Sequence, residues 1–209
     1  MTVRVLVASR NAKKLRELQR VLDSAGIDGI DLIGLDQVPP FPEAPETGAT
    51  FEQNAVAKAR DGAAATGLPC IADDSGLEVD ALRGMPGVLS ARWSGRHGDD
   101  DANTALLLGQ LQDVPDDRRG AAFVSACALA VPREGGETDV TVVRGEWRGD
   151  IVRESRGGNG FGYDPVFRPD GENRTAAELT AEEKDASSHR GRALAQLVPV
   201  LAALAAVDQ

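Results

Sequence analysis

The sequence lacks the features that mark membrane, secreted or nucleic-acid-binding proteins. No apolar run approaches the roughly 18 residues that a membrane helix needs, and the N-terminal segment MTVRVLVASRN lacks the long apolar stretch and cleavage site of a signal peptide. Lysine and arginine number 23 against 33 aspartates and glutamates, a formal net charge of −10. General nucleic-acid binding relies on an extended basic face, so we expect no nucleic-acid partner. The lack of a membrane helix and of a signal peptide leads us to expect a cytoplasmic protein with no membrane partner.

Cysteine, lysine and aromatic residues are also scarce. Cys70 and Cys127 lie far apart, each in a strand-like segment, so buried free thiols are expected rather than a disulfide or a metal site. Aromatic residues make up 4% of the chain, and only four of its 23 basic residues are lysines. A lysine in an arginine-rich chain indicates a need for a compact charge on a flexible stem, with chance as the alternative.

The sequence does contain alternating strand-like and helical patterns along its 209 residues. Strand-like apolar runs lie at 3–9, 30–35, 70–73, 121–133 and 138–149, with another candidate at 77–82. Helical spacing runs from 11 to 25, from 50 to 67, from about 101 to 112, and through the C-terminal stripe. Thr50 and Gln53 form a capping-box pattern. The Gly-rich, charged segment 83–101 predicts a long surface loop.

These patterns predict one α/β domain over residues 1–209. Its mixed β-sheet would carry a long antiparallel hairpin, 121–133 with 138–149, and flanking helices would form two lobes around a central cleft. The C-terminal stripe is expected in the core; it consists of Leu194, Leu197, Val198, Leu201 and Leu204.

The segment SRNAKK, residues 9–14, lies where a strand turns into a helix N-terminus. Unpaired backbone N–H groups and the helix dipole favour an anion there. Ser9 and Asn11 add donors, and Lys14 adds charge, although Glu17 is spaced to form a salt bridge with it. A simple cap with two solvated lysines is the alternative.

The segment GGNGFGYDPVF, residues 157–167, combines glycines with aromatic residues. Glycines let a backbone approach a ligand, and the rings of Phe161 and Tyr163 offer faces on which a base can stack. The alternative is a tight connection in which Phe161 and Phe167 are buried.

Two further segments carry ionisable side chains. TAEEKDASSHRGRAL, residues 180–194, holds Lys184, His189 and Arg190, whose donors suit a phosphate or a purine edge, with a solvated helix start as the alternative. IADDSGL, residues 71–77, places Asp73 and Asp74 before a turn-like Ser75-Gly76.

The acids of IADDSGL fit three chemistries. They could hold Mg²⁺, which prefers carboxylate oxygens and bridges to substrate phosphates. One could act as a general base toward water. Ser75 could instead be a nucleophile with His189 and an aspartate, although the GxSxG elbow is absent. If a strand extends through the two aspartates, alternation sends their side chains to opposite faces.

Six segments in order resemble the inosine triphosphate pyrophosphatase family, whose members hydrolyse non-standard purine nucleoside triphosphates. They are SRNAKKLRE, TFEQNAVAKA, IADDSGL, GMPGVLSARW, GFGYDPVF and EEKDASSHRGRAL, and they span residues 9–194. The resemblance implies hydrolysis of dITP, ITP or XTP to the monophosphate and pyrophosphate, with Mg²⁺, in a cytoplasmic homodimer. It also implies a mixed α/β fold with a central nucleotide cleft.

The resemblance also implies roles for individual residues. Asp74 would be the catalytic carboxylate and a metal ligand, facing the cleft, while Asp73 would anchor the turn or Lys58. Glu46, or alternatively Glu43, would be the second metal ligand, since Pro45 stands where many members have another acid. The nucleotide would be bound by Ser9, Arg10, Asn11, Ala12, Lys13, Lys14, Ser75, Phe161, Gly162, Tyr163, Asp164, Lys184, His189 and Arg190.

Base selection follows as a hypothesis. Donors from His189, Arg190 or nearby backbone could bond the keto oxygen of hypoxanthine or xanthine, whereas the amino group of adenine would face a donor without a partner. Phe161, Tyr163 or Trp93 could stack on the ring. Two alternatives stay open: a nucleotide-binding regulatory module that does not cleave, and a pyrophosphatase with a different base preference.

Overall fold

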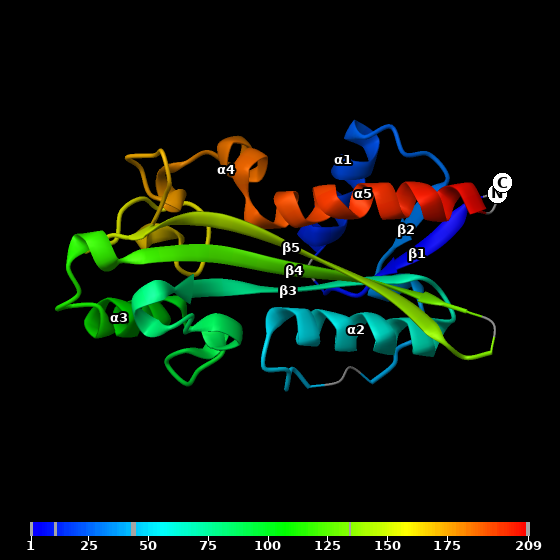
Figure 1. Ribbon diagram of the computed structural model, residues 1–209, viewed down its shortest axis with the longest axis horizontal. Helices are drawn as coiled ribbons and strands as arrows, with labels where there is room; N and C mark the ends of the chain where they lie inside the picture. Colours follow the sequence, from blue (N-terminus) through cyan, green and yellow to red (C-terminus); the bar gives the residue numbers. More distant parts are fainter. Residues whose placement is uncertain (1, 11, 43–44, 134, 208–209) are drawn as a thin grey trace. The chain divides into compact units, whose positions relative to one another are not determined.

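A computed structural model describes residues 2–10, 12–42, 45–133 and 135–207. Within these residues six strands form one sheet in the order β2-β1-β3-β4-β5-β6 (Figure 1). The strand β1 runs parallel to β2 and β3, whereas β5 and β6 are antiparallel. The strands are β1 Val3–Val7, β2 Ile30–Ile33, β3 Cys70–Val79, β4 Gly120–Pro132, β5 Thr138–Ile151 and β6 Phe167–Pro169.

The α-helices of the described chain are α1 Ala12–Ser24, α2 Phe51–Thr66, α3 Asp100–Gln110, α4 Ala181–Ser187 and α5 His189–Val207. The mixed α/β sheet with flanking helices is confirmed, and β4 and β5 lie where the long hairpin was expected. The strand β6 and the helix α4 had no separate signal in the sequence. None of the helices in the described ranges is long and apolar enough to cross a membrane.

The chain forms two compact units. The first contains the residues up to Asp74, Ser125–Gly145 and the residues from Arg190 onward; the second contains Ser75–Val124 and Glu146–His189. The chain therefore passes from one unit to the other within β3, β4 and β5 and again at the start of α5. The predicted single domain and central cleft stay predictions.

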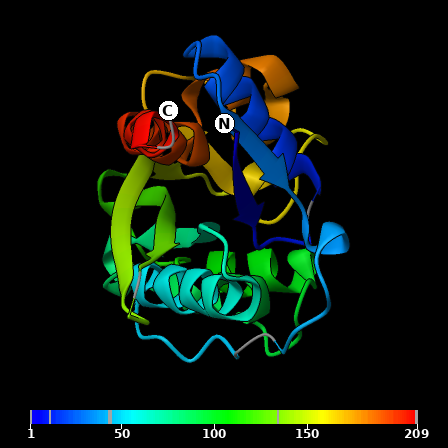
Figure 2. The same ribbon diagram turned by 90° about the vertical axis from the view of Figure 1, so that its right-hand side faces the viewer.

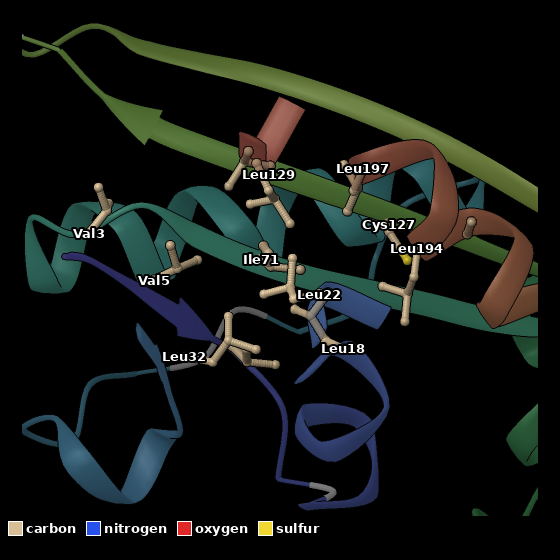
Figure 3. Packing of buried hydrophobic residues seen from close by; sticks show 13 residues of the cluster. Val3, Val5, Leu18, Leu22, Leu32, Ile71, Cys127, Leu129, Leu194 and Leu197 are labelled. Carbon is tan, nitrogen blue, oxygen red and sulfur yellow. The ribbon is translucent and has the colours of Figure 1, made fainter. Parts of the chain in front are cut away.

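In the first unit helices cover both faces of the sheet. Figure 2 shows α2 against one face and α1 with α5 against the other. The face toward α1 and α5 carries an apolar cluster, in which Leu18 and Leu22 of α1 and Leu194 and Leu197 of α5 pack over the strands (Figure 3). Leu201 of α5 belongs to the same cluster. Leu194, Leu197 and Leu201 of the C-terminal stripe are thus core and Leu204 packs against them, as the helical spacing indicated, whereas Val198 is half-buried outside the cluster.

Small residues line the face of α2 that packs on the sheet. Ala55, Ala59 and Ala63 are buried, and a Cβ at Gly62 would lie 2.4 Å from Cys70 Sγ. The helix can therefore approach the strands closely. Cys70 and Cys127 are buried free thiols, as expected, and burial raises the pKa of each to about 12.

The ends of α2 follow the sequence signals with one difference. The Thr50 hydroxyl accepts the Gln53 N–H, and Gly67 adopts φ 69° at the C-terminus. The Gln53 side chain, however, accepts the Ala49 N–H at 2.7 Å. In the predicted capping box the Gln53 side chain would accept the Thr50 N–H. It accepts the N–H of the preceding residue, Ala49, which also faces the helix start.

The second unit has its own apolar core, in which Leu107 of α3 and Leu111, the residue that follows the helix, pack with Leu77, Trp147 and Phe167. The prediction of a long loop over 83–101 was wrong in part. Gly87–Arg92 forms a 3₁₀ helix, and Ser90 within it is buried. Its hydroxyl accepts the Leu77 N–H at 2.9 Å, which ties the segment to β3.

The expected turn at Ser75-Gly76 is also wrong, because β3 continues through it to Val79. Gly76 has a packing role instead. A Cβ there would lie 2.4 Å from Ser90 Oγ and 2.8 Å from the Gly87 carbonyl oxygen. Any larger residue would push the 3₁₀ segment away from the strand.

Candidate active site

The two adjacent aspartates of β3 point to opposite faces of the sheet in the first unit. Ile71 packs into the cluster beneath α1 and α5, and strand alternation places Asp73 on that same face. Asp74 meets side chains of α2 on the other face. The predicted separation of the two acids is therefore confirmed, and one continuous strand is its cause.

Asp73 is the centre of an ionic network on the α1 and α5 face. Its Oδ2 accepts from Lys14 Nζ at 2.8 Å and from Arg190 Nη2 at 2.9 Å. Arg190 also contacts Glu17 at 3.3 Å. Burial would raise the pKa of Asp73, but the charges of Lys14 and Arg190 outweigh burial and hold the pKa far below its usual range. Asp73 is therefore an anion at any ordinary pH.

This network differs from two predictions made from the sequence. Helical spacing favoured a Lys14–Glu17 pair, whereas the structure pairs Lys14 with Asp73 and Glu17 with Arg190. Lys58 was expected to meet the side chain of Asp73, but its Nζ lies 3.5 Å from the Asp73 carbonyl oxygen only. The reason is the pleat, since Lys58 is on α2 and the Asp73 carboxylate faces the other side.

Asp74 belongs to a second cluster, on the α2 face. Its Oδ2 accepts from Asn54 Nδ2 at 2.8 Å, and its Oδ1 lies 3.6 Å from Lys58 Nζ. The same Nζ lies 2.5 Å from Glu46 Oε1. Burial would lower the pKa of Lys58, but the hydrogen bond that Lys58 donates to Glu46 and the charges of Asp74, Glu46 and Asp73 raise it overall. One ammonium thus joins two carboxylates from different segments.

A pocket in the first unit brings the two clusters together. Its lining includes Ser9, Lys14, Lys58, Glu46 and Asp73. The other lining residues are Ala8, Arg10, Leu35, Phe41 and Asp61. Sequence reasoning missed Leu35, Phe41 and Asp61. The first two lie in the chain after β2, where no periodic pattern indicates a ligand, and Asp61 resembles an ordinary helix-surface acid.

Some predicted residues cannot be compared with the geometry. Asn11 and Glu43 lie outside the described residues, and so do the side chains of Ala12 and Lys13. Their roles stay predictions. Ser75 lies in β3 and is half-buried.

The glycine-rich segment in the second unit exposes one aromatic ring. Phe161 is 74% exposed, which is unusual for a large apolar side chain in an ordered segment. Lys184 Nζ lies 5.1 Å from the centre of its ring and forms an ion pair with Asp164. Asp164 in turn accepts the Phe161 N–H at 2.8 Å. Buried Phe161, the alternative from the sequence, is therefore excluded.

The other candidate stacking rings have structural contacts. Tyr163 is buried in the core of the second unit, and its hydroxyl donates to the Ser90 carbonyl at 2.9 Å. Burial, together with the charge of Asp100, raises its pKa. Trp93 donates its indole N–H to Gln110 Oε1 at 2.9 Å. Phe161 is thus the ring best presented to a planar ligand.

His189 and Arg190 are neighbours in sequence but have different surroundings. The His189 ring stacks on Phe123, with centroids 5.3 Å apart and 19° between the planes. The Arg190 guanidinium belongs to the network of Asp73 and Glu17 in the first unit. Arg190 therefore forms an ion pair with Asp73 of β3, an interaction that its sequence context did not indicate.

The first unit thus offers cations and carboxylates suited to a phosphate chain and a hard metal ion, and the second offers an exposed ring with a cation beside it. A family model described as the Ham1 family matches residues 5–200. The chain belongs to the Ham1 family. The resemblance noted in the sequence is thereby confirmed.

Relatives of this Ham1-family chain are similar over almost their whole length. The dITP/XTP pyrophosphatase of Nocardia farcinica is 73% identical over 202 residues, covering 97% of this chain and 96% of that protein. The nucleoside-triphosphatase / dITP/XTP pyrophosphatase structure from Mycobacterium abscessus is 66% identical, with a TM-score of 0.80, covering 95% of this chain and 100% of that one. A HAM1 protein structure from Coxiella burnetii is 42% identical, with a TM-score of 0.85, covering 96% and 98%.

Proposed function

We infer that the chain is a nucleoside-triphosphate pyrophosphatase that hydrolyses dITP and XTP, and also ITP, to the nucleoside monophosphate and pyrophosphate. The observation that carries this inference is the 73% identity to a dITP/XTP pyrophosphatase over nearly the full length. The charged clusters around Asp73 and Asp74 support it. A site that only bound an anionic nucleotide would gain little from two additional carboxylates.

We assign a divalent metal, Mg²⁺, to Asp74 and Glu46. Both carboxylates already approach one cation, the ammonium of Lys58, so they can face a common positive charge. Groups of three or more potential ligands are absent from the described residues. The two carboxylates of Asp74 and Glu46 suit Mg²⁺, which usually takes one or two carboxylates and completes its shell with water and substrate phosphates. When bound, Mg²⁺ would neutralise phosphate charge and polarise the reacting phosphorus.

Asp74 is proposed as the residue that orients or deprotonates the attacking water at the α-phosphate. Asn54 holds one of its oxygens through a hydrogen bond of 2.8 Å, which leaves the other toward Lys58. A carboxylate fixed in this way can act as a base without first reorganising. Pyrophosphate is then the leaving group.

The phosphate chain is assigned to the strand-to-helix turn of the first unit. Ser9, Arg10 and Lys14 line the same pocket as Glu46 and Lys58. Asn11, Ala12 and Lys13 complete the turn and are proposed to contribute backbone or side-chain donors. Asp73 holds Lys14 in place and is not itself a phosphate ligand, since it is an anion.

Base recognition is assigned to the second unit. Phe161 is proposed to stack on the purine, and Gly162, Tyr163 and Asp164 to shape the segment around it. Lys184, His189 and Ser75 are proposed as donors to the base or sugar. Arg190 belongs to the first unit and remains a candidate donor to the nucleotide through the part of its guanidinium that does not contact Asp73 or Glu17. A homodimer and a cytoplasmic location complete the proposal.

The test is pyrophosphate release from dITP, XTP, ITP, dATP and dGTP, each with Mg²⁺ and with a chelator. We expect rapid release from the first three with Mg²⁺ and little from dATP. Binding without release would instead favour a regulatory module. Equal turnover of dATP would contradict the proposed base selection, and equal rates under chelation would contradict the metal assignment.

A further inference from the structure

Gly162, next to the exposed Phe161, is held on both sides of its backbone by one helix. Its N–H donates to Asp100 Oδ2 at 2.7 Å, and its carbonyl oxygen accepts from Thr104 Oγ1 at 3.4 Å. Asp100 and Thr104 lie four residues apart on α3, so they share one helix face. Glycine is suited to this position because its φ is +61°.

The helix α3 is itself firmly placed within the second unit. Leu107 and Leu111 at its C-terminal end are fully buried. Near its N-terminal end Asn103 is buried, accepts the Ser94 N–H at 2.7 Å and donates to the Ala91 carbonyl at 3.3 Å. Asp100 is therefore presented by a rigid element rather than by a mobile loop.

Fixing Gly162 also fixes Phe161. The Phe161 N–H is held by Asp164 on one side, and the peptide that follows Phe161 is held by Asp100 on the other. At Gly160 a Cβ would lie 2.1 Å from Asp164 Oδ2, so the backbone there is close against that carboxylate. The exposed ring thus stands on a backbone anchored on both flanks.

We propose that Asp100, with Thr104, is a positioning residue that pre-organises Phe161 for stacking on the purine base. This inference rests on the proposed function, because it concerns how that function's base-binding ring is held. An anchored ring loses little freedom when the base arrives, so binding is tighter than to a ring on a mobile loop. Asp100 does not touch the nucleotide in this account and acts only through Phe161.

Asp100 also lies in the first turn of α3, where a carboxylate stabilises any helix. Asp101 provides the matched control, since it is in the same turn but exposed. Asp101→Ala removes the favourable charge at the helix N-terminus without removing the bond to Gly162. A difference between the two variants therefore reports the bond and not the helix dipole.

The test compares steady-state hydrolysis of dITP by the wild type and the variants. We expect Asp100→Ala to raise KM roughly tenfold, within the range that stacking on one aromatic ring supplies, with kcat changed less than about twofold. Asp101→Ala should leave both constants within about twofold. Asp100→Asn, whose amide oxygen can still accept the Gly162 N–H, should restore most of the affinity.

A double-mutant cycle separates positioning from a general structural effect. In a Phe161→Ala background Asp100→Ala should add little, because no ring remains to be positioned. Thr104→Val should act in the same direction with a smaller effect, and it serves if Asp100→Ala does not fold. Equal KM values for Asp100→Ala and Asp101→Ala, or a full tenfold effect without Phe161, would overturn the proposal.

The two proposals fail in different ways. If the wild type releases no pyrophosphate from dITP, the proposed function fails. The same variants would then be measured by calorimetric binding of inosine monophosphate, and the cycle would apply to Kd. If the wild type is active and the cycle is additive, only the role of Asp100 fails.

Discussion

The two groups of candidate residues are built from different kinds of contact. In the first unit Asp73 and Asp74 meet Lys14, Lys58 and Arg190 through side-chain ion pairs. In the second unit Phe161 is held through backbone N–H groups that donate to carboxylates, and its ring stays exposed. The ionic arrangement of the first unit suits a charged ligand such as a phosphate chain, whereas the exposed ring of the second unit suits a planar ligand.

This difference predicts different consequences of mutation. Removing a charge from the first group leaves other buried charges without compensation, so both turnover and stability should fall. Removing the exposed ring of the second group leaves no buried charge without a partner, so affinity for the nucleotide should fall while the free energy of unfolding stays nearly unchanged. Each of the following variants can sharpen this contrast or break it.

The largest expected effect is on the turnover of Asp74→Asn. The substitution keeps an acceptor for Asn54 but removes the charge that binds metal and activates water, so kcat for dITP should fall by about 10³-fold or more. Circular dichroism should show an unchanged fold. Asp23→Asn, at an exposed acid on α1, is the control and should retain full activity. Turnover of Asp74→Asn within a few-fold of the wild type would remove Asp74 from the reaction.

The next effect is on the stability of Asp73→Asn. Loss of this largely buried partner, whose side chain is 10% exposed, leaves Lys14 without its carboxylate and Arg190 with Glu17 alone, so the free energy of unfolding should fall by about 3 kcal/mol at neutral pH. Asp139→Asn removes the exposed ion pair with Arg133 and should cost less than about 0.5 kcal/mol. Urea denaturation measures both. Equal losses in the two variants would contradict the network.

The stabilisation by Asp73 should also depend on pH in one direction. Because the pKa of Asp73 is lowered in the folded chain, its contribution is complete above the unfolded pKa of about 3.9 and declines as the pH falls below that value. The difference between wild type and Asp73→Asn should therefore be constant near neutrality and shrink in acid. A difference that grows on acidification would have the wrong sign.

Phe161→Ala should affect affinity instead of stability. Loss of one stacking ring should raise KM for dITP about tenfold, while the unfolding free energy changes little because the ring is exposed. Tyr163→Phe should act mainly on stability, lowering it by about 1 kcal/mol through the lost bond to Ser90, with a smaller rise in KM than Phe161→Ala causes. A stable Phe161→Ala variant whose KM for dITP equals that of the wild type would show that Phe161 does not stack on the base.

The smallest effect concerns the ammonium shared by Glu46 and Asp74. In Lys58→Met these two carboxylates lose their common cation, so the variant should lose about 1 kcal/mol without divalent metal. Mg²⁺ should restore more stability to the variant than it adds to the wild type, because it then neutralises two acids that have lost their shared ammonium. Thermal unfolding with and without Mg²⁺ measures this. An equal Mg²⁺ effect in both proteins would argue against a shared metal site.

Local patterns in the sequence were enough to predict β1, β2, β4 and β5, the long hairpin and the core face of α5, since hydrophobic periodicity determines them. They gave no signal for β6 and divided β3 into two segments. They also separated Asp73 from Asp74 once a continuous strand was assumed. They did not predict that Asp73 would bind Lys14 and Arg190, which come from opposite ends of the chain. Such pairs depend on how the elements pack, and no spacing within one segment encodes that.

The same limit applies to the second unit. The glycines and Phe161 indicated a ligand-binding segment, but not which aromatic ring would be exposed. Tyr163 lies two residues away and is buried. Its hydroxyl can be buried with the ring because it donates a hydrogen bond to the Ser90 carbonyl. Asp100 fell within the segment 83–101, which the sequence predicted to be a loop, and only the folded chain brings it to Gly162.

The most direct test of the proposed reaction is hydrolysis of dITP in water labelled with heavy oxygen, followed by mass spectrometry of both products. Water activated by Asp74 at the α-phosphate predicts one labelled oxygen in the nucleoside monophosphate and none in pyrophosphate. Label in pyrophosphate, or release of inorganic phosphate with a nucleoside diphosphate, would contradict the account.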